Sequence, residues 1–497
     1  MTTVKRRPSA LSAACLTLGL LAGAAGLAGC GASTSGSTPT SSPSASTSSS
    51  GSTETAYDAA VSTPQTDSVY PLVGDKVVDA LHYGLDLTWD KTRLSGTETL
   101  TFRAAVTSPT LTLDFGAALT ATKVTLDGTE VTSTHTGQDL VVAAPVTADS
   151  RHVLTLTYAG TPTPVKDPAK RSDAEPLGLT ATPEGGLWTM QEPYGAFTWY
   201  AVNDQPADKA LYDVTVHAPA GMVGISNGTL TSRTDTAAGT TTVWHSAAPM
   251  ASYLTTLAVG AYTETKATSA SGVPLAYWVP TDDSTPLKTL KKTPELLAWL
   301  EKRLGPYPFD SLSILIVPAQ SAMETQTTLT LGNTPDSYSA DVLVHEMAHQ
   351  WYGDEVTPAD WRDVWMNEGM ATYLQMTWQD QAWGRNAGDS LADMTLFEAD
   401  DRANGGPPGA YKADHFADDN VYSSTALMWD QVRKTVGKKT FWKLVREWPA
   451  ARAGTSVTRA DYLSWLSTTS GTNLRPLITR WLMSRTTPPL VSSSTHR

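Results

Sequence analysis

The chain has 497 residues, of which 40% are hydrophobic and 17% charged, and its formal net charge is −13. This length is enough for two or three packed domains. The acidic balance argues against nucleic acid as a partner, because phosphate contacts need clustered lysine and arginine.

The start of the chain has the pattern of a secretory signal. Lys5 to Arg7 precede an apolar run from about Ala10 to Leu27, as in a signal peptide. The run ends in Leu-Ala-Gly followed by Cys30, which resembles the lipobox of bacterial lipoproteins. That resemblance implies a lipid anchor on Cys30 and a protein tethered to the membrane outside the cytoplasm. The alternatives are an ordinary signal peptide cut at a small-residue site, or a membrane-spanning anchor.

Two segments are therefore set apart from the folded body. Residues 1–29 are the predicted signal, and they contain Cys15, so the mature chain is expected to have no disulfide. Residues 30–66 begin at the lipidated cysteine and are mostly Ser, Thr, Gly and Pro. Such a segment buries too little apolar surface to offset its ordering entropy, so it is predicted to be a disordered tether. No later apolar run is long enough to predict another membrane span.

Residues 67–262 are predicted to form an all-β domain. Apolar and polar residues alternate at period two, with turn residues between the runs, which is typical of half-buried strands. The clearest strands are predicted at residues 83–89, 97–102, 111–114, 153–158, 214–217 and 253–259.

Residues 263–490 are predicted to form a mainly helical domain, with a short tail at 491–497. Leu287 to Leu304 have helical spacing with Gly305 as a stop, and Leu312 to Val317 read as a buried strand. The segment 384–420 is too polar and broken to assign. Further helices are predicted at about residues 421–436, 439–448, 459–467 and 474–483. A β domain followed by a helical domain gives an α+β fold.

The most informative stretch is His345-Glu346-x-x-His349. On a helix the two histidines lie one turn apart on the same face, so both imidazoles can bind one metal ion. Glu346 lies roughly 100° around the helix axis from His345, where it can reach a water on the metal without being a ligand. Catalytic zinc takes a third protein ligand and keeps a fourth position for water. Glu368, with eighteen residues between it and His349, is the predicted third ligand.

Other interpretations of this motif fit less well. A lone His-Glu-x-x-His occurs by chance on many helices, but the spaced Glu368 is an independent match. A motif with a third histidine would need glycine and histidine where Tyr352 and Glu355 stand. A structural zinc site would favour thiolates, and no cysteine is near. The residues predict a zinc peptidase with one zinc per chain.

Together with Asn367-Glu368-Gly369, the motif and its eighteen-residue gap resemble the M1 family of zinc aminopeptidases. In the related thermolysin-like pattern the gap is typically one residue longer. Residues 321–325, Ser-Ala-Met-Glu-Thr, resemble the family's Gly-x-Met-Glu-Asn motif. Residues 199–209 resemble its N-terminal β domain and residues 481–490 the end of its thermolysin-like catalytic domain. The resemblance covers roughly residues 68–490.

The resemblance implies a role for each residue of the metal motif. His345, His349 and Glu368 would hold zinc, which lowers the pKa of a water and polarises the scissile carbonyl. Glu346 would take a proton from that water and pass it to the leaving amine.

It also implies a substrate site. Glu324, with Ala322 and Met323 before it, would bind the free α-amino group of the substrate. Cleavage would then be restricted to the N-terminal peptide bond. The alternative for Glu324 is a strand-end carboxylate in solvent. Glu192 is expected as a second amine anchor from the β domain, and the adjacent Gln191 is its alternative.

The family uses a tyrosine to stabilise the oxyanion. Val421-Tyr422-Ser423, followed by Ala426, matches the family's Val-Tyr-x-Lys-Gly-Ala segment, with Ser-Thr in place of Lys-Gly. Tyr422 is the predicted oxyanion donor and Tyr411 the fallback.

The expected function is a zinc-dependent aminopeptidase acting on peptides with a free N-terminus. A zinc endopeptidase, another hydrolase on the same site and an inactive peptidase-like surface binding protein are the open alternatives. Longer family members add a large helical domain over the active site, whereas this chain stops at Arg497. The resemblance therefore implies a more open site that tolerates longer peptides.

Overall fold

The computed structural model describes residues 57–171 and 173–490. The predicted signal, Cys30, most of the predicted tether and the predicted tail lie outside these residues. Among the described residues, no helix combines the length and the apolar character that a membrane span requires.

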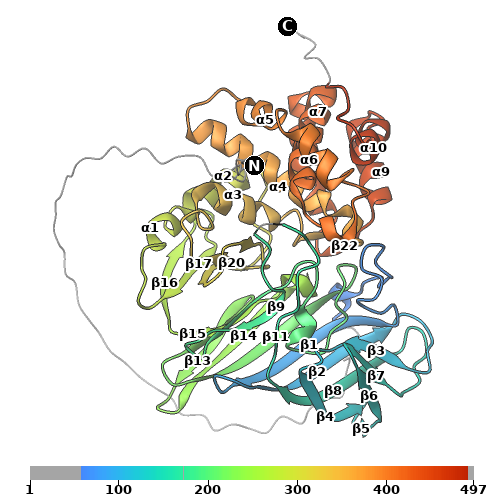
Figure 1. The fold of residues 1–497 in the computed structure, drawn as a ribbon, viewed down its shortest axis with the longest axis vertical. Coiled ribbons are helices and arrows are strands. Elements are labelled where there is room, and N and C mark those ends of the chain that lie inside the picture. Colours follow the sequence, from blue (N-terminus) through green and yellow to red (C-terminus); the bar gives the residue numbers. More distant parts are fainter. Residues whose placement is uncertain (1–56, 172, 491–497) are drawn as a thin grey trace, which may run out of the picture. The chain divides into compact units, whose positions relative to one another are not determined.

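The first half of the described chain is built from strands, coloured blue to green in Figure 1. The largest sheet contains β1 (Val78–Trp89), β2 (Leu94–Ala104), β4 (Leu119–Leu126), β5 (Thr129–Glu130), β8 (Arg151–Gly160), β11 (Lys209–Pro219), β13 (Thr229–Asp235) and β14 (Gly239–Ala251). Their order is β13-β14-β11-β1-β2-β8-β4-β5. Only the β1–β11 pair is parallel among these described strands. Alternate residues of β2 are buried, as the period-two pattern predicts.

Two smaller sheets complete the β region. One contains β9 (Gly178–Ala181), β10 (Leu187–Met190), β12 (Val223–Ser226) and β15 (Leu257–Gly260), and the other contains β3 (Leu111–Asp114), β6 (Ser133–Thr136) and β7 (Asp139–Val142). The strand predicted at residues 253–259 is wrong in its first half, where Ser252–Leu254 form a 3-10 turn. The reason is Gln191, whose amide donates to the carbonyls of Ser252 and Thr255, so those groups do not pair with a strand.

A five-stranded sheet follows the β region. It contains β16 (Tyr262–Thr268), β17 (Pro274–Pro280), β18 (Leu312–Val317), β19 (Ala322–Met323) and β20 (Thr328–Gly332), in the order β16-β17-β18-β20-β19. The central strand β18 is buried at every residue and has parallel neighbours on both sides. Such a strand is expected to be an unbroken apolar run, as Leu312 to Val317 is.

Two helices, not the single one predicted, connect β17 to β18. They are α1 (Leu287–Leu290) and α2 (Thr293–Leu304). Pro294 stands in the first turn of α2, where its missing N–H and fixed φ are tolerated, so the helix restarts at this point. Gly305 ends α2 with a φ of 104°, a conformation that favours glycine.

The second half is mainly helical, coloured orange to red in Figure 1. Its helices are α3 (Ala340–His349), α4 (Trp365–Ala382), α5 (Asp389–Met394), α6 (Glu398–Gly405), α7 (Asp419–Val436), α8 (Lys438–Ala451), α9 (Arg459–Ser470) and α10 (Arg475–Met483). A short parallel pair, β21 (Val356–Pro358) and β22 (Thr455–Val457), lies among them. The segment 384–420, which the sequence left unassigned, contains α5 and α6. The predicted order of a β domain before a helical domain is confirmed.

Helix α4 lies between α3 and α7, and its place is fixed by close packing. Trp365 at its start stacks on Tyr462 of α9, with ring centroids 6.0 Å apart. A Cβ at Gly369 would lie 2.3 Å from Thr425 Oγ1 of α7. Only glycine allows α7 to approach this closely, and the approach brings Tyr422 of α7 near Glu368 of α4.

Candidate active site

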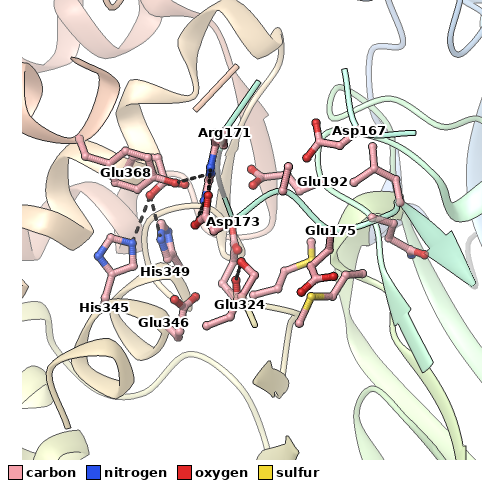
Figure 2. Close-up of a pocket in the computed structure, with 18 residues that line it drawn as sticks. Asp167, Arg171, Asp173, Glu175, Glu192, Glu324, His345, Glu346, His349 and Glu368 are labelled. Carbon is pink, nitrogen blue, oxygen red and sulfur yellow. Dashed lines mark hydrogen bonds and ion pairs between the residues drawn. The ribbon is translucent and has the colours of Figure 1, made fainter. Parts of the chain in front are cut away.

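The predicted metal ligands meet between α3 and α4. His345 and His349 lie one turn apart on α3, and Glu368 lies in the first turn of α4. Glu368 Oε2 is 3.2 Å from His345 Nε2 and 3.4 Å from His349 Nε2, and Figure 2 shows the carboxylate facing both imidazoles. The ligand atoms of all three residues are within 4.8 Å of one another.

The Nδ1 atom of each imidazole contacts a carbonyl oxygen of the protein. His345 Nδ1 lies 3.1 Å from Gln375 Oε1, and His349 Nδ1 lies 3.0 Å from the carbonyl oxygen of Tyr352. A carbonyl oxygen can only accept, so each Nδ1 carries a proton, and Nε2 is the nitrogen of each ring that remains to bind a metal. Two imidazole nitrogens and one carboxylate oxygen, oriented in this way, are a donor set that fits zinc.

The electrostatics also fit a divalent cation. Burial raises the pKa of Glu346 to about 8, and the nearby carboxylates of Glu324 and Glu368 add to the rise. Burial likewise raises the pKa of Glu324, partly opposed by His349. Burial opposes ionisation of Glu368 too, but His349 and His345 hold the pKa of its carboxyl well below the usual range. A bound dication would offset the repulsion among these acids.

A pocket opens beside these ligands. It brings together all the site residues predicted from the sequence that lie in the described part of the chain: Glu192, Ala322, Met323, Glu324, His345, Glu346, His349, Glu368 and Tyr422. The other predicted residue, Cys30, lies outside the described residues.

Two carboxylates in this pocket have an oxygen without a protein partner. Glu324 directly follows β19 and is only 3% exposed, so it is not the solvent-facing carboxylate of the alternative interpretation. Within the described chain, Glu324 Oε1 and Glu192 Oε1 are buried and accept no hydrogen bond. One oxygen each of Glu192, Glu324 and Glu368 lies within 4.8 Å of the other two. Buried acceptors left open in a pocket point to a cationic ligand.

The structure separates the alternatives left by the sequence. The amide of Gln191 is fully used, since it donates to two carbonyls and accepts from Trp199 Nε1 at 2.9 Å. Glu192 is therefore the residue of this pair with a free oxygen. Tyr411 is buried away from the pocket, where its hydroxyl donates to the carbonyl oxygen of Trp361. Tyr422 lines the pocket, and its ring centroid is 5.9 Å from that of His345.

Gln350 links the segment after β19, which contains Glu324, to the end of α3. Its Nε2 donates to the carbonyl oxygen of Glu324 at 2.9 Å, and its Oε1 accepts from the backbone N–H of Thr327 at 2.9 Å. Gln350 immediately follows His349, so one amide sets the position of the acidic pocket relative to the metal ligands.

Two family descriptions match this chain. Residues 79–254 match the Peptidase M1 N-terminal domain, and residues 288–481 match the Peptidase family M1 domain. The chain belongs to the M1 peptidase family. The predicted resemblance, the α+β fold and the class of zinc metallopeptidase are therefore confirmed.

Relatives within the M1 family are about equally distant. Aminopeptidase N of Streptomyces lividans is 27% identical over 399 residues, which cover 72% of this chain and 44% of that protein. Aminopeptidase N of Acetobacter pasteurianus is 27% identical over 323 residues, which cover 60% of this chain and 90% of that protein. This chain therefore spans less than half of the first relative and most of the second.

Solved M1 structures share the whole described fold. A mutant M1 zinc metallopeptidase from Deinococcus radiodurans, bound to a Tyr-Ser-Ala substrate, superposes with a TM-score of 0.77 at 27% identity. The match covers 86% of this chain and 99% of that chain. A two-domain M1 zinc metallopeptidase mutant bound to L-tryptophan superposes with a TM-score of 0.78 over the same shares.

One wall of the pocket was not predicted. The segment between β8 and β9 places Asp167, Arg171, Asp173 and Glu175 in the lining, as Figure 2 shows. It has neither strand alternation nor helical spacing, and it resembles no M1 motif quoted above. The one available signal was composition: residues 166–175 contain six charged side chains within a threonine-rich domain.

Proposed function

We propose that this M1 chain is a zinc-dependent aminopeptidase that removes the N-terminal residue from peptides. The observation that carries the proposal is the pair of open carboxylate oxygens on Glu192 and Glu324, next to the His345–His349–Glu368 site. A peptide's free ammonium group can satisfy both acceptors, whereas an internal peptide segment would leave them buried and unpaired. Such a site selects free N-termini.

The relatives support the same substrate class. The two bacterial relatives are named aminopeptidase N. The solved mutants hold L-tryptophan, L-arginine or the tripeptide Tyr-Ser-Ala, each of which has a free α-amino group.

The geometry gives each residue a task in peptide hydrolysis. His345, His349 and Glu368 would hold zinc, which supplies a Lewis acid when bound. Glu346, buried beside the ligand set, removes a proton from the attacking water and delivers it to the nitrogen of the leaving amine. As the water oxygen adds to the carbonyl carbon, the Tyr422 hydroxyl donates a hydrogen bond to the carbonyl oxygen, where negative charge develops. The C–N bond then breaks as the C=O bond re-forms and the amine leaves with its added proton.

Aminoacyl anilides, compared with their N-acetylated forms, test this function. The free amines should be cleaved and the acetylated compounds refused, and a chelator should abolish the cleavage. Glu324→Gln should keep its zinc and lose about 100-fold in kcat/KM, because a hydrogen bond to a charged group contributes about 1.5–3 kcal/mol.

The control is Glu184→Gln, which makes the same change on an exposed turn outside the pocket and should leave the kinetics unaltered. Equal cleavage of both compound sets would point to an endopeptidase or another hydrolase. A zinc-loaded protein that cleaves neither set would favour a binding protein on a peptidase scaffold.

We also propose that the enzyme is a lipoprotein tethered to the membrane outside the cytoplasm through Cys30. The support is the basic and apolar start of the chain and the Leu-Ala-Gly-Cys sequence at its end. Metabolic labelling with a fatty acid tests this: Cys30→Ala should lose the label and leave the membrane fraction. Cys15→Ala, inside the predicted signal, is the matched control and should keep both. Labelling that survives Cys30→Ala would contradict the proposal.

A further inference from the structure

We propose that Arg171, from the β domain, is a positioning residue for Tyr422: it holds the phenol so that its proton faces the pocket. The inference rests on the proposed aminopeptidase function and adds to it a residue that no M1 motif in the sequence indicated. It starts from a contact between two side chains that are 251 residues apart.

The direction of one hydrogen bond carries the argument. Arg171 Nη1 lies 3.1 Å from Tyr422 Oη. A guanidinium has only donors, so the phenol oxygen must accept in this bond. The phenol's own proton is then left to point elsewhere, and Tyr422 lines the pocket beside His345. A hydroxyl that accepts from a cation is also a stronger donor, because hydrogen bonds in a chain polarise one another.

Arg171 is itself aimed by a neighbour. Its Nε and Nη2 donate to the two carboxylate oxygens of Asp173 at 3.0 and 2.8 Å. This two-point pair fixes the plane of the guanidinium and leaves Nη1 to face the phenol. Figure 2 shows Asp173 directly below Arg171, joined to it by dashed lines, with Glu368 to their left.

The segment that carries Arg171 is attached to the catalytic domain on both sides. Lys170 forms an ion pair with Asp414 through its side chain and a hydrogen bond through its backbone N–H, at 3.2 Å, to the carbonyl oxygen of Asp414. Glu175 Oε1 accepts from the backbone N–H of Gln320 at 2.6 Å. These contacts hold the segment against the pocket, so the guanidinium is a built part of the site.

The positive charge of Arg171 contrasts with the mainly acidic lining of the pocket. Among the described residues that line this pocket, it is the one with a lysine or arginine side chain, whereas seven lining residues are acidic. Asp173 is already paired with Arg171, so the negative charge of Asp173 does not compete with the Glu192–Glu324 site for the substrate's ammonium group. The remaining hydrogen bond of Arg171 is with Tyr422, the proposed oxyanion donor.

The experiment measures kcat and KM on an aminoacyl anilide with zinc content matched across the variants. Arg171→Met should lower kcat about 10- to 100-fold, less than the roughly 100- to 1,000-fold expected for Tyr422→Phe, which removes the donor itself. KM should change by no more than about twofold, because the contact acts on the transition state. The double variant should fall little below Tyr422→Phe alone, since the two residues act as one unit.

The matched control is Lys166→Met. This residue carries the same charge in the same segment, but it is exposed and does not line the pocket. It should keep the kcat of the unmodified chain. Added guanidinium ion should restore part of the kcat of Arg171→Ala, whereas methylammonium should not, and neither should help Tyr422→Phe. A purely structural role for Arg171 would show no such rescue.

Three outcomes would overturn this role: an unchanged kcat in Arg171→Met, effects of Arg171→Met and Tyr422→Phe that multiply, or a loss confined to KM. The last would mean that Arg171 binds the substrate directly. If the unmodified chain cleaves no free-amine anilide, the proposed function fails first, and the role of Arg171 falls with it.

Discussion

Buried carboxylates occur in two regions of this molecule, and their hydrogen bonds differ. In the β region, Asp67 accepts from the backbone N–H groups of Val69, Tyr70 and Trp361 at 2.6–2.8 Å. Asp204 similarly accepts from the backbone N–H of Gly195 and from a serine hydroxyl. Each of these acids is held by the fold itself.

The acids of the pocket are not held in this way. Glu192 and Glu324 each keep a buried oxygen without a partner in the described chain, and Glu368 contacts two imidazoles. Both groups of acids are buried, so burial alone does not distinguish a site from a scaffold. The distinction is whether the protein supplies the donors or leaves them to a ligand.

Removing a pocket acid should have the largest effect. Glu368→Ala should lose zinc and all measurable peptidase activity, because two histidines alone leave the metal two ligands short. Metal analysis of the purified protein beside the anilide assay checks this. Glu346→Gln is the control: it should keep its zinc and lose about 100- to 10,000-fold in kcat, the range for a general base. Full zinc content in Glu368→Ala would show that this carboxylate is not a ligand.

Removing a scaffold acid should affect stability and not chemistry. Asp67→Ala leaves three backbone donors without an acceptor, at roughly 1 kcal/mol each, so the free energy of unfolding should fall by about 3 kcal/mol. Urea unfolding measures this loss, and kcat per bound zinc should stay near that of the unmodified chain. Asp67→Asn keeps one acceptor oxygen and should lose less. A large fall in kcat at full stability would show that Asp67 also takes part in the chemistry.

Glu98 on β2 is intermediate between these two groups of buried acids. One of its oxygens accepts from the backbone N–H of Ala201 at 2.9 Å, and the other has no partner among the described residues. It does not line the pocket beside the metal ligands. Burial raises the pKa of Glu98 to about 8, so the fold keeps it as a neutral acid at pH 7.

This raised pKa predicts a pH dependence of stability. Between the ordinary value of 4.5 and about 8, the unfolded chain releases this proton while the folded chain keeps it. Stability from Glu98 is therefore full below pH 4.5 and falls as pH rises, by about 1.4 kcal/mol per pH unit. Glu98→Gln lacks the titrating group, so its free energy of unfolding relative to the unmodified chain should increase from pH 5 to pH 7. An equal change in the urea midpoints of both proteins between pH 5 and pH 7 would contradict this.

The parts of the site on regular elements could be predicted from the sequence. His345 and His349 are one helical turn apart, a spacing that already places both on one face. Glu368 and Tyr422 could be located because each follows a recognisable family pattern. Arg171 and Asp173 could not, because a loop between two strands has no period and its path depends on contacts such as Lys170–Asp414.

The errors in the predicted fold also arise from features that local spacing does not show. The helix predicted over Leu287 to Leu304 breaks where Pro294 restarts it. The first half of the strand predicted at residues 253–259 is replaced by a turn. The side chain of Gln191, which is distant in the sequence, donates hydrogen bonds to the carbonyl oxygens of Ser252 and Thr255. Local spacing cannot show a partner that only the folded chain brings near.

The separation of 251 positions in the sequence between Arg171 and Tyr422 also bears on when the enzyme becomes active. Chains are synthesised from the N-terminus, and domains fold as they emerge. The β domain is complete before the histidines of α3 are made, and Tyr422 of α7 comes later still. An unfinished chain therefore cannot assemble this pocket. Peptidase activity can start only after nearly the whole described fold exists.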